Sequence, residues 1–153
     1  MADSQPMTEN PMAQPQAIHH VRLTVTDIGR SKAFYRSLLG ADPAIDFSDQ
    51  AGQPGVGEDP ERFFGGCVFA LGDQLLGLRP VAAAGDRFES TRVGLDHLSL
   101  SVGSRAELTA AAARLDAAGV AHGEVTDLTD AGLAILSLQD PDDINLELTA
   151  ALS

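Results

Sequence analysis

IHHVRLTV, at residues 18–25, returns later in the chain as LDHLSLSV, at residues 95–102, with a histidine in the same register. In both stretches apolar and polar residues alternate, which is the period of a strand with one buried face. Each stretch runs into a segment of helical periodicity, and each half of the chain closes on a short strand, Leu76–Leu78 or Leu146–Leu148. The sequence therefore predicts a tandem duplication of one small unit.

The first unit reads as a strand, a helix and three further strands. Asp27 suits the N-cap of the helix and Gly40 its C-cap, with an apolar stripe between them. The Gly- and Pro-containing stretch 48–57 predicts a long loop, either a mobile lid or an edge. The predicted strands of this unit are residues 17–25, 44–47, 66–71 and 74–79, the last two forming a hairpin.

The second unit repeats this order. Ser104 is expected to cap its helix, with Glu107 three residues on as the partner in a capping box, and the helix should end near Gly119. The predicted strands are residues 95–102, 125–128, 133–138 and 145–148.

Together the two units predict an α+β fold of two tandem βαβββ modules, residues 17–82 and 93–150, in one domain. We expect the three adjacent strands of each module to curl into half a barrel, so that the two halves enclose a cleft. Residues 1–16 are polar and without periodicity, which predicts a disordered N-terminal tail.

Composition excludes several classes of partner. The formal net charge is −12, with only 10 Lys and Arg residues against 22 Asp and Glu, so neither a nucleic acid nor an anionic membrane is expected to bind. No apolar run is long enough to cross a bilayer, and the N-terminal stretch lacks the features of a signal peptide. A cytoplasmic location is therefore expected. Cys67, in an apolar run, is expected to be a small core residue.

Alternation also predicts which side chains face the cleft. The apolar positions of the strands must lie against the helices, so His20, His97 and Glu147 point the other way. Two imidazoles and one carboxylate are a recognised ligand set for Fe(II), Mn(II), Ni(II), Co(II) or Zn(II), and they leave coordination positions for water or substrate. His19 competes with His20 as the ligand, but its register places it on the helix side or at the fraying start of the strand.

Other polar residues on these strands are candidates for binding substrate. Arg22 and Ser99 share the cleft-facing side with the histidines. Arg79 either binds an anionic group of the substrate or is a solvated strand end. Tyr35 lies in the apolar stripe of the first helix and is expected in the core, whereas His122, in a turn, is expected at the surface.

The motifs resemble those of the vicinal oxygen chelate superfamily, which includes glyoxalase I, bleomycin-resistance proteins, fosfomycin-resistance enzymes and extradiol dioxygenases. The resemblance covers almost everything from residue 17 to residue 148. It rests on HVxLxVxD at 20–27, SxxFYxxxLG at 31–40, DHL at 96–98 and DPDDxNLEL at 140–148.

The resemblance implies metal ligands at His20, His97 and Glu147, with Gly77 at a fourth position where a common glyoxalase I has a carboxylate. The carboxylate there takes part in proton transfer, so ordinary glyoxalase chemistry is not expected. The remaining His-His-Glu set is the one that extradiol dioxygenases and fosfomycin-modifying enzymes use.

Two classes of function remain open. In the first, the chain is an enzyme whose single divalent metal chelates vicinal oxygens of a small-molecule substrate, with Glu147 as the catalytic residue and dioxygenase-like or lyase- and isomerase-like chemistry. In the second, it is a metal-free protein of the bleomycin-resistance type that sequesters a drug or metabolite. A homodimer is expected, because curled half-barrels leave sheet edges that pairing of modules would cover.

Overall fold

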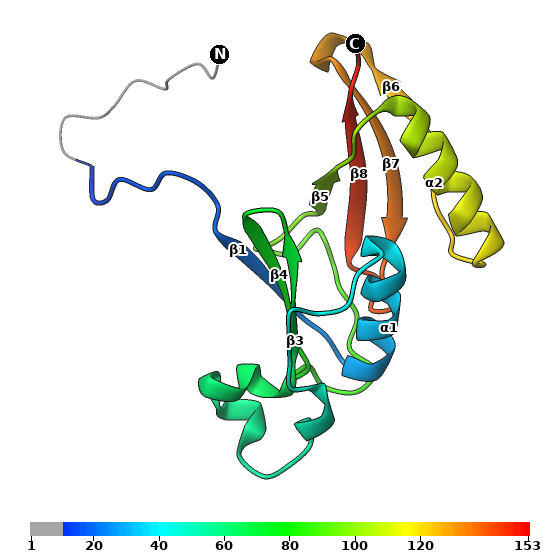
Figure 1. Cartoon of the computed structure of the whole chain (residues 1–153). Helices are drawn as coiled ribbons and strands as arrows, with labels where there is room; N and C mark the ends of the chain where they lie inside the picture. The colour runs from blue at the N-terminus through cyan, green and yellow to red at the C-terminus, as the bar shows by residue number, and fades with distance from the viewer. Residues whose placement is uncertain (1–10) are drawn as a thin grey trace.

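A computed structural model describes residues 11–153, and Figure 1 shows the path of the chain. The strands are β1 (His20–Thr24), β2 (Ile45–Asp46), β3 (Cys67–Leu71), β4 (Gln74–Arg79), β5 (Leu98–Ser101), β6 (Thr126–Leu128), β7 (Leu133–Gln139) and β8 (Asn145–Ala151). The helices are α1 (Ile28–Leu39) and α2 (Arg105–Ala117), and short 3₁₀ turns lie at Ser48–Gln50, Val56–Glu58, Pro60–Gly65 and Thr129–Ala131. This order confirms the α+β class and the two βαβββ modules.

The predicted tail falls only partly within this description. Residues 11–16 form neither a helix nor a strand, and the rest of the tail lies outside the described residues. None of the helices in residues 11–153 is long and apolar enough to cross a membrane.

Each module contributes one four-stranded sheet, in the order β1-β4-β3-β2 in the first and β5-β8-β7-β6 in the second. In both sheets the first strand lies parallel to the last strand of its module, and the other pairs are antiparallel. The sequence led us to expect sheets curled into half-barrels around a common cleft. The observed sheets are open instead. The physical reason is that the edge strands β1 and β5 do not pair with each other in the chain, so no continuous curved surface joins the two sheets.

The strand that carries His97 is shorter than predicted. Residues 95–102 read as one strand, but β5 begins only at Leu98, where its ladder with β8 starts opposite Leu146. Carried back one residue, the same register would set His97 opposite Asn145, the first residue of β8, and the residues before His97 would lie beyond the end of that strand. His97 therefore stands just before the strand, with its backbone free of the ladder.

The helix ends follow the predicted capping chemistry. Asp27 accepts a hydrogen bond from the backbone N–H of Arg30, and Gly40 ends α1 in the left-handed conformation at φ 66°. Ser104 accepts from the backbone N–H of Glu107 at 3.2 Å. The other half of the predicted capping box is not formed, because the side chain of Glu107 pairs with Arg114 two turns along the helix.

A single apolar core joins the two modules. It contains Leu23 and Leu78 of the first sheet, Leu146 and Leu148 of the second, and Leu108 of α2. The apolar strand positions thus face the helices, as alternation predicts. Cys67 is fully buried, and burial raises the pKa of its thiol to about 11. It is a core residue, as expected.

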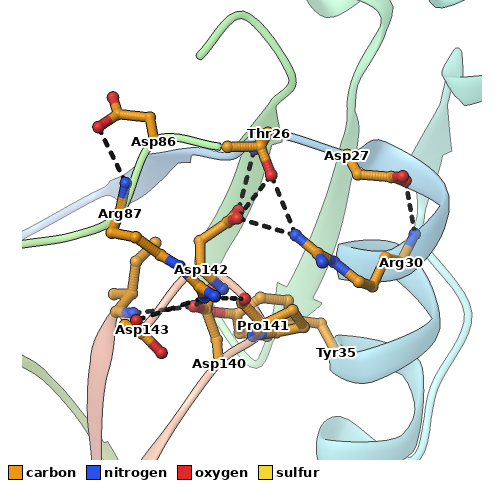
Figure 2. A network of polar contacts seen from close by, with 11 residues as sticks. Thr26, Asp27, Arg30, Tyr35, Asp86, Arg87, Asp140, Pro141, Asp142 and Asp143 are labelled. Carbon is orange, nitrogen blue, oxygen red and sulfur yellow. Dashed lines mark hydrogen bonds and ion pairs between the residues drawn. The ribbon is translucent and has the colours of Figure 1, made fainter. Parts of the chain in front are cut away.

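A buried polar network fastens α1 to the turn between β7 and β8 (Figure 2). The hydroxyl of Tyr35 donates to Oδ2 of Asp140 at 2.8 Å, and the backbone N–H groups of Asp142 and Ile144 donate to Oδ1 of the same carboxylate. Burial raises the pKa of both Tyr35 and Asp140. Tyr35 is fully buried, so its predicted core position is confirmed.

Asp142 extends the network to the start of α1. Its carboxylate accepts from the backbone N–H of Thr26 at 2.9 Å and from the Thr26 hydroxyl at 2.6 Å. Arg30 adds an ion pair at 3.1 Å (Figure 2). These contacts hold the beginning of the first helix against the last hairpin of the chain, and so join the first module to the second.

Candidate metal and substrate site

His97 and Glu147 lie together on the face of the second sheet that points away from α2. The Nε2 atom of His97 is 3.9 Å from Oε1 of Glu147, and its Nδ1 atom is 2.7 Å from Oδ1 of Asp96. The hydrogen bond to Asp96 raises the pKa of the imidazole. In the neutral ring, a carboxylate at Nδ1 favours the tautomer with its hydrogen there, so the lone pair of Nε2 is directed toward Glu147.

This pair can close on one metal ion after a small movement. Two donor atoms that each lie about 2.1 Å from the same ion are about 3.0–3.4 Å apart in octahedral or tetrahedral geometry, so the separation of 3.9 Å has to shorten by about half an ångström when an ion binds. Imidazole nitrogen and carboxylate oxygen suit the divalent transition metals predicted from the sequence. Asp96, which orients His97, is a partner that the sequence reading had not assigned, although it stands next to the histidine.

Ser99 helps to hold the side chain of Glu147 in place. Its hydroxyl is hydrogen-bonded to that of Thr149, and Thr149 donates to Oε1 of Glu147 at 3.1 Å. Ser99 also stands directly opposite Glu147 in the strand register. In this structure Ser99 orients the Glu147 carboxylate through Thr149. The sequence had not pointed to Thr149.

An open pocket of about 480 Å³ lies above the pair. His97 and Glu147 line it, together with Gln139, Asn145 and His122. His122 was expected at the surface, but only 14% of its side chain is exposed. The reason is that its ring is held between Asp116, 2.8 Å from Nε2, and the carbonyl of Gly123, 2.6 Å from Nδ1.

His20 is exposed at the start of β1 and does not line this pocket. Within residues 11–153 no group of three His, Cys, Asp or Glu side chains stands close enough to hold a metal ion. The Nδ1 atoms of His19 and His20 lie 2.9 Å apart, so the two rings form one exposed imidazole pair. A single chain thus brings two of the three predicted ligands together and leaves the third apart.

Arg22 lies against Gly77, the residue at which the resemblance implies a missing carboxylate. The two residues are opposite each other in the parallel ladder of β1 and β4, and Gly77 is buried. A Cβ atom at Gly77 would lie 3.3 Å from Nε of Arg22 and 3.4 Å from its Cγ. The missing side chain therefore makes room for a guanidinium group.

Arg79 lies on the same sheet face, two residues farther along β4. Its guanidinium carbon is 3.8 Å from the centre of the Phe64 ring, and that of Arg22 is 5.3 Å from the same centre. The Nε atom of Arg79 is buried and has no hydrogen-bond partner among the described residues. Arg79 is thus packed into the sheet face, which does not fit the alternative of a solvated strand end.

The aromatic residues beneath these arginines were not predicted. Phe63 and Phe64 lie in the 3₁₀ segment Pro60–Gly65, and Phe63 stacks on Phe47 with ring centres 6.0 Å apart. This segment follows the loop predicted at 48–57, which forms 3₁₀ turns and buries Val56. The only sequence signal was the pair of adjacent phenylalanines before two glycines.

Residues 17–148 match the family model of the Glyoxalase/Bleomycin resistance protein/Dioxygenase superfamily. The chain belongs to this superfamily, and the resemblance inferred from its motifs is confirmed. A similar solved structure is the glyoxylase/bleomycin resistance protein/dioxygenase domain from Frankia sp. EAN1pec, with 29% sequence identity and a TM-score of 0.70. The match covers 90% of this chain and 99% of that one.

Two more distant structures share the fold. The fosfomycin resistance protein FosX from Listeria monocytogenes is 16% identical, with a TM-score of 0.64, and the match covers 90% of this chain and 95% of that one. Lactoylglutathione lyase from Agrobacterium tumefaciens is 17% identical, with a TM-score of 0.61 and coverage of 90% and 96%. No curated protein matches the sequence.

Proposed function

We propose that the chain is a metal-dependent enzyme that chelates vicinal oxygens of a small-molecule substrate. One divalent metal is held by His97 and Glu147 of one protomer and by His20 of a second copy. The observation that carries this proposal is the orientation of His97, whose Nδ1 is held by Asp96 while Nε2 is 3.9 Å from the Glu147 carboxylate. Carboxylate-oriented histidines of this kind are typical of metal ligands.

The positions of the ligands support a second copy as the source of His20. His20 opens β1 and His97 directly precedes β5, and these two strands are edges of their sheets. Edge strands expose unpaired backbone groups, and pairing with another copy is a common way to cover them. In a two-fold symmetric dimer the same contact occurs twice, so two complete sites would form.

The residues of the site have distinct roles in this proposal. The metal, when bound, supplies Lewis acidity toward the substrate oxygens. Thr149 and Ser99 hold the Glu147 carboxylate in place, and Asp96 orients the His97 ring by accepting a hydrogen bond at Nδ1, so that Nε2 is the nitrogen that would bind the metal. Glu147, a carboxylate that is only partly exposed and lines an open pocket, takes up or returns a proton of the substrate in this proposal.

Metal content tests the proposal. Protein purified without chelators or a His tag should contain about one divalent metal per chain, and His20→Ala, His97→Ala and Glu147→Ala should each lower that content sharply. His122→Ala is the matched control, because it removes an imidazole from the same pocket without removing a proposed ligand. Unchanged metal content in His97→Ala would overturn the assignment.

A metal-free binding function has one observation in its favour. The stacked rings of Phe47 and Phe63 provide an aromatic surface on the first module, of the kind that a sequestering protein uses for stacking. In that case the wild-type protein would contain no stoichiometric metal and would bind an aromatic compound equally well after treatment with a chelator.

A further inference from the structure

Most basic side chains of the chain are paired with carboxylates, and two of the exceptions stand together on the first sheet. Of the 10 basic residues of the chain, all but Arg22, Arg79 and Arg92 form ion pairs with carboxylates within residues 11–153. The paired ones are Arg30, Lys32, Arg36, Arg62, Arg87, Arg105 and Arg114. Arg92 stands in an exposed loop. The remaining two, Arg22 and Arg79, stand together on one sheet face.

Both of these guanidinium groups are held by the same aromatic ring. Their carbons lie 5.3 Å and 3.8 Å from the centre of Phe64. Stacking on a ring uses the flat face of a guanidinium and leaves its N–H edge free to donate to an oxyanion. The Nε of Arg79 is buried and has no acceptor among the described residues, which is unfavourable. An anion bound at the terminal Nη groups of the same guanidinium would offset part of that cost.

The backbone beneath the ring is strained in a way that serves this arrangement. Phe63 and Phe64 have φ angles of 49° and 58°, the left-handed conformation that residues with a side chain rarely adopt. Behind them, Gly66 passes so close to β4 that a Cβ atom there would collide with the carbonyl of Leu78. Strain of this kind concentrates at binding sites, and here it places Phe64 against the two arginines.

We propose that Arg22 and Arg79, supported by Phe64, bind an oxyanion of the substrate, either a carboxylate or a phosphonate-type group. This inference deepens the proposed function by naming a class of substrate, an anionic small molecule. Arg22 lies two residues beyond His20 on the same face of β1, with their Cα atoms about 7 Å apart. The substrate therefore carries its anionic group within a few bonds of the oxygens that the metal chelates.

Calorimetric titration of the full-length, chelator-treated protein tests this subsite independently of the metal. The probes are benzoate and phenylphosphonate, with neutral benzamide as the control for ring stacking alone. Binding of benzoate identifies a carboxylate subsite, and binding of phenylphosphonate alone identifies a phosphonate-type one. Binding of neither anion, or equal binding of benzamide, overturns the proposal.

Variants assign the binding to the two arginines. Arg79→Gln and Arg22→Gln should each weaken anion binding at least about tenfold, because each removes a charge-assisted donor, whereas the control Arg92→Gln should leave it unchanged. Undiminished binding in both Gln variants would contradict the proposal. If Arg79→Gln does not fold, Gly77→Glu gives a second test, since a carboxylate beside Arg22 should compete with the anion and abolish its binding.

The test of the anion subsite and the test of the metal site can fail independently of each other. Arg79→Gln should retain the metal content of the wild type, because Arg79 is not a proposed ligand. If the wild type contains no metal but binds the anion through Arg22 and Arg79, the metal-dependent function fails and the anion subsite stands. If it contains metal but binds no anion, the reverse holds.

Discussion

At the scale of single residues, the molecule depends on buried carboxylates that are fully hydrogen-bonded. Asp140 accepts two backbone N–H groups through one oxygen and the Tyr35 hydroxyl through the other. It is 4% exposed, so its donors have no access to water as a replacement. One side chain thus holds both the turn before β8 and the middle of α1.

Replacing Asp140 with Ala should destabilise the protein by about 2–4 kcal/mol, because two backbone N–H groups and one phenol lose their acceptor in a buried place. Asp140→Asn is the matched control, since its amide oxygen still accepts from the backbone, and it should cost about 1 kcal/mol or less. Urea unfolding followed by circular dichroism measures both. Equal losses in the two variants would show that the carboxylate charge, not the hydrogen bonds, stabilises the turn.

The neighbouring histidines give a second test at this scale. We expect His20→Ala to lower the metal content sharply and His19→Ala to leave it close to that of the wild type, because alternation along β1 places His20 on the face of Arg22. Elemental analysis of the two purified variants decides between the rings. The opposite result would make His19 the ligand.

At the scale of elements, α2 is joined to the strand that follows it by His122. The ring bridges Asp116 near the end of the helix and the Gly123 carbonyl, next to the point where His122 pairs with Leu138 of β7. The hydrogen bond to Gly123, followed by that to Asp116, raises the pKa of His122 above its ordinary value of 6.5. The protonated ring therefore favours the folded state.

This bridge predicts a pH dependence of stability. Since the folded pKa is raised, the stabilisation is fully present below the unfolded value and is lost as the pH rises through the folded value. The melting temperature of the metal-free protein should therefore fall as the pH rises above the ordinary histidine pKa of 6.5, and His122→Gln should reduce that fall. Asp116→Asn should reduce it less, because the Gly123 carbonyl remains. An identical fall in His122→Gln would refute the link.

At the scale of the whole molecule, the predicted metal ligands of one chain lie in two separate places. His97 and Glu147 are on the second sheet, and His20 is at the edge of the first. The buried network of Tyr35, Asp140 and Asp142 holds the modules in this arrangement (Figure 2). A second copy is therefore needed to complete the metal site in our proposal.

Subunit mixing tests this arrangement. His20→Ala and His97→Ala homodimers should both lack metal, but in a heterodimer of the two variants one of the two sites keeps every ligand. Refolding them together at equal amounts should restore about a quarter of the wild-type metal content. Light scattering should give the mass of a dimer. A monomer mass, or no recovery of metal on mixing, would rule out a shared site.

The fold could be predicted from the sequence because the signals of its helices and strands are local. Alternation along residues 18–25 and 95–102, the Asp27 and Ser104 caps and the Gly72-Asp73 hairpin turn each act over a few residues, and they were sufficient to predict both modules. Strand limits were less accurate, because the start of β5 depends on where its distant partner β8 begins.

The site could be predicted from the sequence only in part, because its geometry depends on contacts that are not local. Residue types and strand faces point to His20, His97 and Glu147 as candidates, but whether they meet depends on the relative placement of the two sheets, which long-range contacts such as that of Tyr35 with Asp140 determine. Likewise, nothing local to Arg79 or Gly77 indicates that Phe64 and Arg22 pack beside them. Periodicity predicts the direction of a side chain, whereas its neighbours arise from packing between segments far apart in the chain.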